Sequence, residues 1–248
     1  MDDNTFPGGV AALRIISLRS GVIVVDKPAG LATQAPPGIP SAESWLRDWQ
    51  ADTSAGSYLG VPHRLDRAVS GVLAFAGTPR AARILSRQFA RRQVTKRYFA
   101  LVAPTEGVVP PPPNVVTEWR DHLAKVPDEP RARIVAADAE GAREAITSVR
   151  LVTSLATAAG TRLLLLLEPR TGRMHQLRVQ AAARGLPIVN DQLYGAAMES
   201  EWCGADPRAA AIALHAWSIG YADPETAAPV TITVAPPAPW PDVTSFLS

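Results

Sequence analysis

The chain has 248 residues, 47% of them hydrophobic and 19% charged, and its 25 Lys and Arg against 23 Asp and Glu give a formal net charge of +2. This composition is typical of a soluble globular protein with a substantial core, and so small a net charge does not by itself indicate a nucleic-acid partner. The longest apolar runs, such as residues 163–167, are too short to span a membrane, and the acidic first residues lack a secretion signal. Cys203 is the only cysteine, which excludes an internal disulfide and favours a cytoplasmic location.

The N-terminal third of the chain predicts two strands and two helices. Residues 21–26 form an apolar run typical of a buried strand, and residues 27–30 form the turn that ends it. Ser41 is placed to cap a short helix. A second apolar strand is expected over residues 71–76. Residues 80–92 then show apolar positions on one face and arginines at helical spacing on another, which predicts an amphipathic helix with a basic side.

The rest of the chain is dominated by predicted strands, over residues 97–103, 115–119, 131–136, 145–155, 161–168, 212–218 and 230–234. The strand over 161–168 holds an unbroken run of leucines and is therefore expected at the centre of a sheet. A helix is predicted over residues 171–184, ending at Gly185. Many strands with few helices indicate an α+β fold with a mixed, mostly antiparallel β-sheet flanked by helices and loops.

Positive charge is concentrated in one part of the sequence. No Asp or Glu occurs between Arg67 and Thr105. The cations of this stretch are Arg67, Arg80, Arg83, Arg87, Arg91, Arg92, Lys96 and Arg97. An uncompensated basic stretch in a nearly neutral protein is typical of a surface that faces a polyanion, although a solvated helix face with counter-charges from elsewhere explains it equally well.

Several classes of enzyme lack their sequence motifs here. The chain has no Gly-x-Gly-x-x-Gly after a strand, no phosphate-binding loop ending in Gly-Lys-Ser/Thr and no Gly-x-Ser-x-Gly segment. One cysteine and four scattered histidines give no metal-ligand spacing. Dinucleotide enzymes, nucleoside-triphosphate enzymes, serine esterases and zinc enzymes are therefore disfavoured.

The first candidate site is the segment His63-Arg64-Leu65-Asp66-Arg67, which precedes the strand over 71–76. Arginines on both sides favour the ionised form of the Asp66 carboxyl. An ionised carboxylate can attack the anomeric carbon of a sugar or stabilise the cation that forms there, and neighbouring arginines can bind phosphates or fill the space left by an extruded base. Taken alone, the segment is also explained by a turn held by an Arg–Asp ion pair.

The second candidate site is the start of the predicted helix over 171–184. Arg173, His175 and Arg178 lie there, and His175 and Arg178 share a face of the helix. Free backbone donors at a helix start together with these side chains would make an anion site. A partly buried helix whose Arg and His bind neighbouring carbonyls is the alternative.

The two segments belong to a larger ordered set that resembles the RluA family of RNA pseudouridine synthases from about residue 20 to 240. The matching segments are Asp26-Lys27-Pro28-Ala29-Gly30-Leu31, residues 63–71, Lys96-x-Tyr98-x-Ala100-Leu101-Val102, Thr171-Gly172-Arg173-x-His175-Gln176-Leu177-Arg178-Val179 and Leu214-His215-Ala216-Trp217. The resemblance implies the pseudouridine synthase fold with a central active-site cleft. Residues 1–20 are then an N-terminal extension and residues 21–248 a single catalytic domain, without a separate N-terminal RNA-binding domain.

The resemblance also implies roles for individual residues. Asp66 matches the catalytic aspartate, Tyr98 the tyrosine that stacks on the target uracil, and Arg178 the arginine that pairs with the aspartate. Arg64 matches the residue associated with displacing the flipped nucleotide. An aromatic side chain in a basic stretch, as at Tyr98, is in any case a natural platform for a base. The residues expected to bind RNA or substrate are His63, Arg64, Arg67, Arg87, Arg91, Lys96, Arg173 and His175.

Four positions depart from the usual family pattern. Ala68 stands where an acidic residue is usual, Val69 and Met174 where Thr is usual, and Gln180 where His is usual. None of these positions carries a direct chemical role in the family. The departures therefore bear on substrate preference and leave the predicted activity unchanged.

The implied reaction is the isomerisation of uridine to pseudouridine in ribosomal or transfer RNA. Asp66 either attacks the anomeric carbon or first removes a sugar proton, and the sequence leaves both routes open. Substrate and product have the same composition, so we expect no metal and no organic cofactor. RNA is the expected partner, bound by a monomer without a membrane or an obligatory protein partner.

Two other functions stay open on the sequence. A non-catalytic RNA-binding or RNA-folding protein could keep the same fold, although a pure binder gains nothing from a carboxylate directed at a polyanion. A glycosidase or base-excising hydrolase is more distant, because such enzymes normally use two carboxylates or an activated water and neither candidate site contains a second acid.

Overall fold

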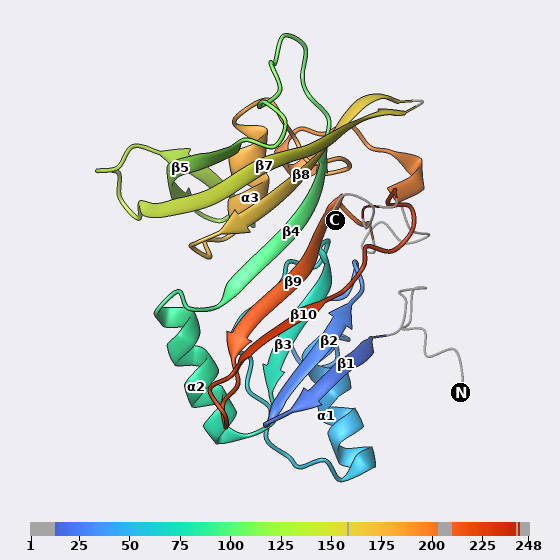
Figure 1. The fold of residues 1–248 in the computed structure, drawn as a ribbon, viewed down its shortest axis with the longest axis vertical. Helices are drawn as coiled ribbons and strands as arrows, with labels where there is room; N and C mark the ends of the chain where they lie inside the picture. The colour runs from blue at the N-terminus through green and yellow to red at the C-terminus, as the bar shows by residue number, and fades with distance from the viewer. Residues whose placement is uncertain (1–12, 158, 203–209, 242, 244–248) are drawn as a thin grey trace. The chain divides into compact units, whose positions relative to one another are not determined.

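The chain forms two compact units, which are described separately. The computed structural model describes residues 13–157, 159–202, 210–241 and 243 (Figure 1). Unit 1 comprises Met1–Thr95, Cys203–Ala211 and Ala216–Pro237. Unit 2 comprises Lys96–Trp202, Ile212–His215 and Ala238–Ser248. Where the sequence predicts one catalytic domain, the contacts within the chain thus separate two parts, each with its own strands.

The strands of unit 1 are β1 (Arg14–Arg19), β2 (Val22–Lys27), β3 (Ser70–Ala76), β9 (Leu214–Ala222, within this unit from Ala216 on) and β10 (Pro229–Thr233). They lie in the order β1-β2-β3-β9, and β10 pairs with β9. The β1–β2, β2–β3 and β9–β10 pairs are antiparallel. All seven residues of β3 are buried, so this strand forms the centre of the unit.

Strand β1 lies within the predicted N-terminal extension. Its residues pair with β2 through a turn at Ser20 and Gly21, both of which have positive φ values, 49° and 71°. Positive φ at both turn residues is the backbone twist that a two-residue hairpin requires. Residues 14–19 of the expected extension therefore pair with β2 as a strand of unit 1.

The helices of unit 1 follow the sequence prediction closely. Helix α1 (Ala42–Thr53) begins after Ser41, whose hydroxyl accepts from the backbone N–H of Ser44 while the Ser44 hydroxyl accepts from the Ser41 N–H. Helix α2 (Pro79–Ala90) begins after Thr78 and buries Ala81, Leu85 and Gln88. The Gln88 side-chain amide exchanges two hydrogen bonds of 2.8 Å with the backbone of Ala222, which fastens α2 to β9.

Unit 2 is built on the strands β4 (Thr95–Val102, in this unit from Lys96 on), β5 (Val116–Lys125), β6 (Ala132–Val135), β7 (Arg143–Thr157) and β8 (Gly160–Pro169). Their order is β4-β8-β7-β5-β6, and each of these pairs is antiparallel. The leucines at 163–167 are all buried in β8, which lies between β4 and β7. The predicted central position of this strand is confirmed.

The helical segments of unit 2 are short. They are α3 (Gln176–Ala182) and the single-turn 3₁₀ helices η1 (Gln192–Tyr194) and η2 (Ser200–Trp202). The helix predicted over residues 171–184 therefore begins five residues late, after His175, whose φ is 51°. The helix also ends two residues earlier than predicted, at Ala182, and Gly185, with φ of 66°, lies in the turn that follows.

Side-chain hydrogen bonds explain why residues 171–175 are not helical. The Thr171 hydroxyl accepts from the Ile146 N–H at 2.9 Å, and the Gln176 amide donates to the Ile146 carbonyl at 3.1 Å. The Gln176 side-chain oxygen in turn accepts from the Arg173 N–H and from the Thr171 hydroxyl. These bonds hold the segment against β7 in an irregular path that a periodicity in the sequence cannot show.

The observed architecture confirms the predicted α+β class. Few helices accompany a mostly antiparallel arrangement of strands, and each unit carries its own buried strand. Among the residues that the structure describes, no helix combines the length and the apolar character needed to cross a membrane.

Gly71→Ala is expected to destabilise the protein by more than about 3 kcal/mol. Gly71 has φ of +113°, and a Cβ atom there would lie 2.2 Å from the backbone oxygen of Ala216. Backbone atoms cannot move aside as a flexible side chain can. Urea unfolding measures the loss. Gly38→Ala is the matched control, because φ is +83° but nothing lies within 4 Å, and about 1 kcal/mol is expected there. Equal losses in the two variants would contradict the steric explanation.

Candidate active site

The loop that carries Asp66 is fixed on one side by Thr33. The buried Thr33 hydroxyl accepts from the Leu65 N–H at 3.0 Å and donates to the Leu65 carbonyl at 2.9 Å. On the other side of Asp66 a turn closes through a 3.1 Å bond from the Val69 N–H to the Asp66 carbonyl. The backbone of Asp66 is thus held on both sides.

A completely buried lysine joins this loop to the turn after β2. The Lys27 ammonium donates to the carbonyls of Pro28 and Leu31, both at 2.8 Å, and to the carbonyl of Arg67 at 3.4 Å. The Gly30 N–H donates to the same Arg67 carbonyl at 2.8 Å. The two segments of the resemblance, residues 26–31 and 63–71, are therefore bound to each other through one ammonium group.

Burial lowers the pKa of Lys27 to about 7, and the charge of the nearby Asp66 carboxylate partly opposes that effect. The ammonium of Lys27 and the carboxylate of Asp66 therefore attract each other across the two segments. The sequence identified residues 26–31 by resemblance only, and gave no sign that Lys27 interacts with Asp66.

The other predicted binding residues of this loop differ in exposure. Arg64 and Arg67 are exposed. His63 is half-buried: its Nε2 accepts from the Ala74 N–H at 3.0 Å, and its ring stacks on Phe89 with centroids 4.6 Å apart. His63 therefore ties the loop to β3 and α2, and its predicted contact with RNA stays a prediction.

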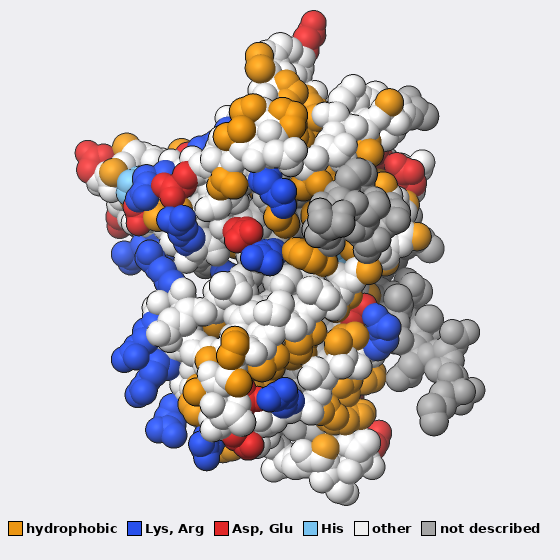
Figure 2. Space-filling view, viewed as in Figure 1, with side chains coloured by type: hydrophobic (Ala, Val, Ile, Leu, Met, Phe, Trp, Pro, Cys, Tyr) orange, Lys and Arg blue, Asp and Glu red, His pale blue; other side chains and the backbone are white. Residues whose placement is uncertain are grey.

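Helix α2 presents an exposed row of arginines. Figure 2 shows blue side chains gathered over this helix, at the lower left of the view. Its members are Arg80, Arg83, Arg87 and Arg91, spaced three or four residues apart, and this set is called the arginine row below. Within the part of the chain that the structure describes, no carboxylate forms an ion pair with any of them. The row extends about 16 Å along the helix axis.

In unit 2, Lys96 and Tyr98 lie on the same face of β4, because side chains alternate along a strand. Both are half-buried. The Lys96 ammonium donates to the Thr171 carbonyl at 3.4 Å, and burial lowers the pKa of Lys96 to about 8. Arg97 points to the opposite face, where it pairs with Glu168 at 3.2 Å.

Arg178 is buried in α3 and paired with a carboxylate that the sequence analysis did not single out. Its Nε and Nη2 atoms donate to the two oxygens of Asp191, each at 2.7 Å. The Tyr194 ring lies 5.1 Å from the guanidinium carbon. The sequence offers one sign of this pair: Asp191 is an acidic residue in the segment that follows the helix and precedes Tyr194-Gly195.

The other predicted residues of this segment, His175 and Arg173, each have a partner within unit 2. His175 Nδ1 lies 2.9 Å from the Tyr194 hydroxyl, and Arg173 Nε donates to the Glu144 carbonyl at 2.9 Å. Gln180, one of the departures from the family pattern, is fully buried and donates to Asp121 at 2.7 Å while accepting from Thr147. Gln180 thus serves the packing of α3 against β5 and β7.

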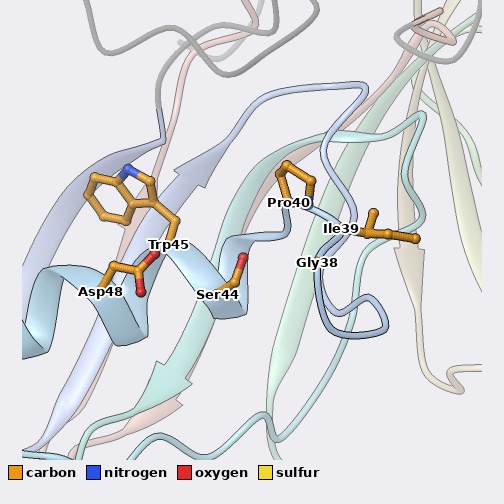
Figure 3. A pocket seen from close by; sticks show the side chains of 6 residues that line it. All are labelled: Gly38, Ile39, Pro40, Ser44, Trp45 and Asp48. Carbon is orange, nitrogen blue, oxygen red and sulfur yellow. The ribbon is translucent and has the colours of Figure 1, made fainter.

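A surface pocket of about 320 Å³ lies elsewhere in unit 1 (Figure 3). It is lined by residues of α1 and of the loop before it, namely Gly38, Ile39, Pro40, Ser44, Trp45 and Asp48. None of the predicted site residues lines it. The predicted residues are instead divided between the two units: Asp66 belongs to unit 1, and Tyr98 and Arg178 belong to unit 2. The approach of Asp66 to Tyr98 and Arg178 stays a prediction.

Comparison with known proteins decides the family. Residues 21–183 match the RNA pseudouridylate synthase family. The chain is 36% identical over 194 residues to an uncharacterized RNA pseudouridine synthase of Zymomonas mobilis, which covers 75% of this chain and 80% of that protein. It is also 36% identical over 179 residues to the dual-specificity RNA pseudouridine synthase RluA of Salmonella typhi, covering 70% and 73%. The chain belongs to this family.

One further relative and one solved structure are also similar to this chain, the structure in fold. The ribosomal large subunit pseudouridine synthase D of Xanthomonas campestris is 32% identical, and the match covers 87% of this chain and 63% of that protein. In fold, the human RNA pseudouridylate synthase domain containing 1 superposes with a TM-score of 0.70 at 24% identity, covering 94% of this chain and 87% of that one. The resemblance, the fold and the isomerase class predicted from the sequence are confirmed.

Lys27→Met is expected to flatten the pH dependence of the free energy of unfolding of this synthase between about pH 7 and 10. The pKa of Lys27 is lowered from 10.5 to about 7 in the folded protein. The unfolded chain therefore binds more protons in this window, and the free energy of unfolding of the wild type rises with pH there. Below pH 7 Lys27 is charged in both the folded and the unfolded protein, so the destabilisation caused by burying the charge reaches its maximum and no longer changes with pH. Methionine has no such group, so the slopes differ by at most about 1.4 kcal/mol per pH unit.

Urea unfolding at several pH values measures the two slopes. Lys125→Met, at an exposed position of β5, is the control and should keep the wild-type slope. If Lys27→Met kept it as well, the ammonium would not be held in the buried state described here.

Proposed function

We propose that this protein isomerises uridine to pseudouridine in ribosomal or transfer RNA, with Asp66 as the catalytic carboxylate. The observation that carries the proposal is the fixed position of Asp66. Its backbone is bound on both sides, and the ammonium of Lys27 attracts its carboxylate. A carboxylate whose backbone is fixed suits chemistry at an anomeric carbon, where positive charge develops.

The proposed reaction begins with cleavage of the bond between uracil N1 and ribose C1′. Asp66 either bonds to C1′ directly or removes a proton from the sugar, and both routes stay open. The uracil turns and C5 bonds to C1′, after which C5 loses its proton and N1 gains one. Atoms and charge balance without a redox partner. Tyr98 is proposed to stack on the uracil and to take part in proton removal, and Arg178 to pair with Asp66.

The proposed RNA-binding surface extends beyond the residues at the reacting base. Its members are His63, Arg64, Arg67, Arg87, Arg91, Lys96, Arg173 and His175. The arginine row supports this part of the proposal best, because exposed guanidinium groups that form no ion pair with a described carboxylate keep their charge available for phosphates. We further propose that the protein acts as a monomer and that it is located in the cytoplasm. The single cysteine favours the second of these proposals.

Asp66→Asn is expected to abolish turnover while RNA binding is retained or tightened, because the variant loses the repulsion between its carboxylate and phosphate. Release of tritium from RNA labelled at uracil C5 measures turnover. Asp52→Asn, an exposed acid in α1, is the control and should behave as the wild type. Near-normal turnover in Asp66→Asn would contradict the role of Asp66. A wild type that releases no tritium would indicate a non-catalytic RNA-binding protein, and free uracil among the products a hydrolase.

Arg87→Glu or Arg91→Glu is expected to weaken RNA binding and to flatten its salt dependence, with little effect on stability. Removing one guanidinium that binds a phosphate should reduce the slope of log K against log salt by about 0.7 to 0.9. Binding titrations between low and moderate salt measure both quantities. Arg87→Gln and Ser86→Glu form a matched pair on α2, because each lowers the net charge by one at an exposed position. Only Arg87→Gln removes a member of the arginine row, so equal losses of RNA affinity in the two variants would contradict a specific role of the row in RNA binding.

A further inference from the structure

Two arginines of unit 2 have the same kind of environment and differ in burial. Arg178 pairs with Asp191 and faces the Tyr194 ring at 5.1 Å. Arg184, six residues later, pairs with Asp121 at 3.0 Å and faces the Trp119 ring at 4.9 Å. The side chains of Arg178 and Asp191 are only 8% and 1% exposed, whereas those of Arg184 and Asp121 are 29% and 13% exposed.

The geometry of the Arg178 pair fixes the orientation of the guanidinium group. Two bonds of 2.7 Å use its Nε and Nη2 atoms, so the group can neither rotate about its bond to Cδ nor slide along the carboxylate. The aromatic ring of Tyr194 limits its movement out of the guanidinium plane. These contacts therefore also fix the direction in which the other edge of the guanidinium group, formed by Nη1 and Nη2, can donate hydrogen bonds.

The Tyr194 ring is itself held at its hydroxyl. That oxygen accepts from the Ala132 N–H at 2.9 Å and lies 2.9 Å from His175 Nδ1. Tyr194 is thus held by Ala132 of β6 and by His175 at the start of α3, while Asp191 and Tyr194 themselves contact Arg178. A buried ion pair is weak evidence for stability, since apolar side chains of similar volume often stabilise a fold as well or better. The contacts of Arg178 with Asp191 and Tyr194 therefore say more about the orientation of its guanidinium group than about the stability of the fold.

We infer that Asp191 and Tyr194 are positioning residues of the catalytic site. They act through Arg178 by holding the guanidinium in the orientation that the reaction requires. The inference rests on the proposed function, because Arg178 is assigned to the site through that proposal. The Arg184–Asp121 pair, with its own aromatic ring, lacks any proposed catalytic partner and serves as the internal comparison.

Asp191→Asn is expected to lower kcat on the order of 10- to 100-fold, because a misplaced catalytic group loses about that much. The KM for RNA should stay within about twofold, since binding by the arginine row is untouched. The matched control is Asp121→Asn, which removes the equivalent charge beside Arg184 and should keep the wild-type kcat. Tritium release from RNA labelled at uracil C5 measures both constants.

A double-mutant cycle separates positioning from general loss of structure. If Asp191 acts only through Arg178, Asp191→Asn should cause no further loss of kcat in an Arg178→Gln background. Additive losses would overturn the inference, and so would equal losses in Asp191→Asn and Asp121→Asn. Asp191→Glu keeps the charge but moves the carboxylate by one methylene group. It should fold and still lose kcat, and full activity in this variant would also overturn the inference.

The wild type distinguishes this inference from the proposed function. A wild-type protein that releases tritium, together with an unimpaired Asp191→Asn variant, overturns the positioning role alone. A wild type without tritium release overturns the proposed function and, with it, the inference.

Discussion

The site in unit 1 depends on one buried ammonium group. Lys27 is removed from water entirely, yet its charge is satisfied by backbone carbonyls of two separate segments. An uncompensated charge in that place would be very unfavourable, so the two segments have to stay together for the ammonium to be tolerated. Because one of these segments carries Asp66, the position of the carboxylate follows from the hydrogen bonds of a lysine that is distant in the sequence.

Unit 2 stabilises its buried cation differently. Arg178 is paired with a carboxylate and an aromatic ring, whereas Lys27 is bound by carbonyls. The difference follows from the two cations, since a planar guanidinium matches a carboxylate through two parallel bonds and a compact ammonium accepts three separate oxygens. The ammonium therefore binds chain segments to each other, while the guanidinium has its own direction fixed.

The sequence predicted those features that depend on local patterns. The leucines of β8, the Ser41 cap and the basic face of α2 each have a periodic or capping signal, and all three are confirmed. Strand β1 was missed because its residues are mostly half-buried or exposed and give no clear alternation. The start of α3 was misplaced because long-range hydrogen bonds of Gln176 to β7 decide it. The bond of Lys27 to the Arg67 carbonyl and that of Arg178 to Asp191 were missed for the same reason, because these partners lie 40 and 13 positions away along the chain.

The attachment of α2 to β9 through Gln88 has a consequence for recognition. Because the helix is fastened at its buried face, the spacing of the Cα atoms that carry its outward arginines is set before any ligand arrives, and little backbone freedom is lost on contact. A row of positive charge at fixed backbone spacing can bind a sugar–phosphate chain, but contacts with phosphates carry no information about the bases. If the row binds RNA as proposed, discrimination among uridines has to arise from the bending and unstacking of the strand and from groups that touch the target nucleotide.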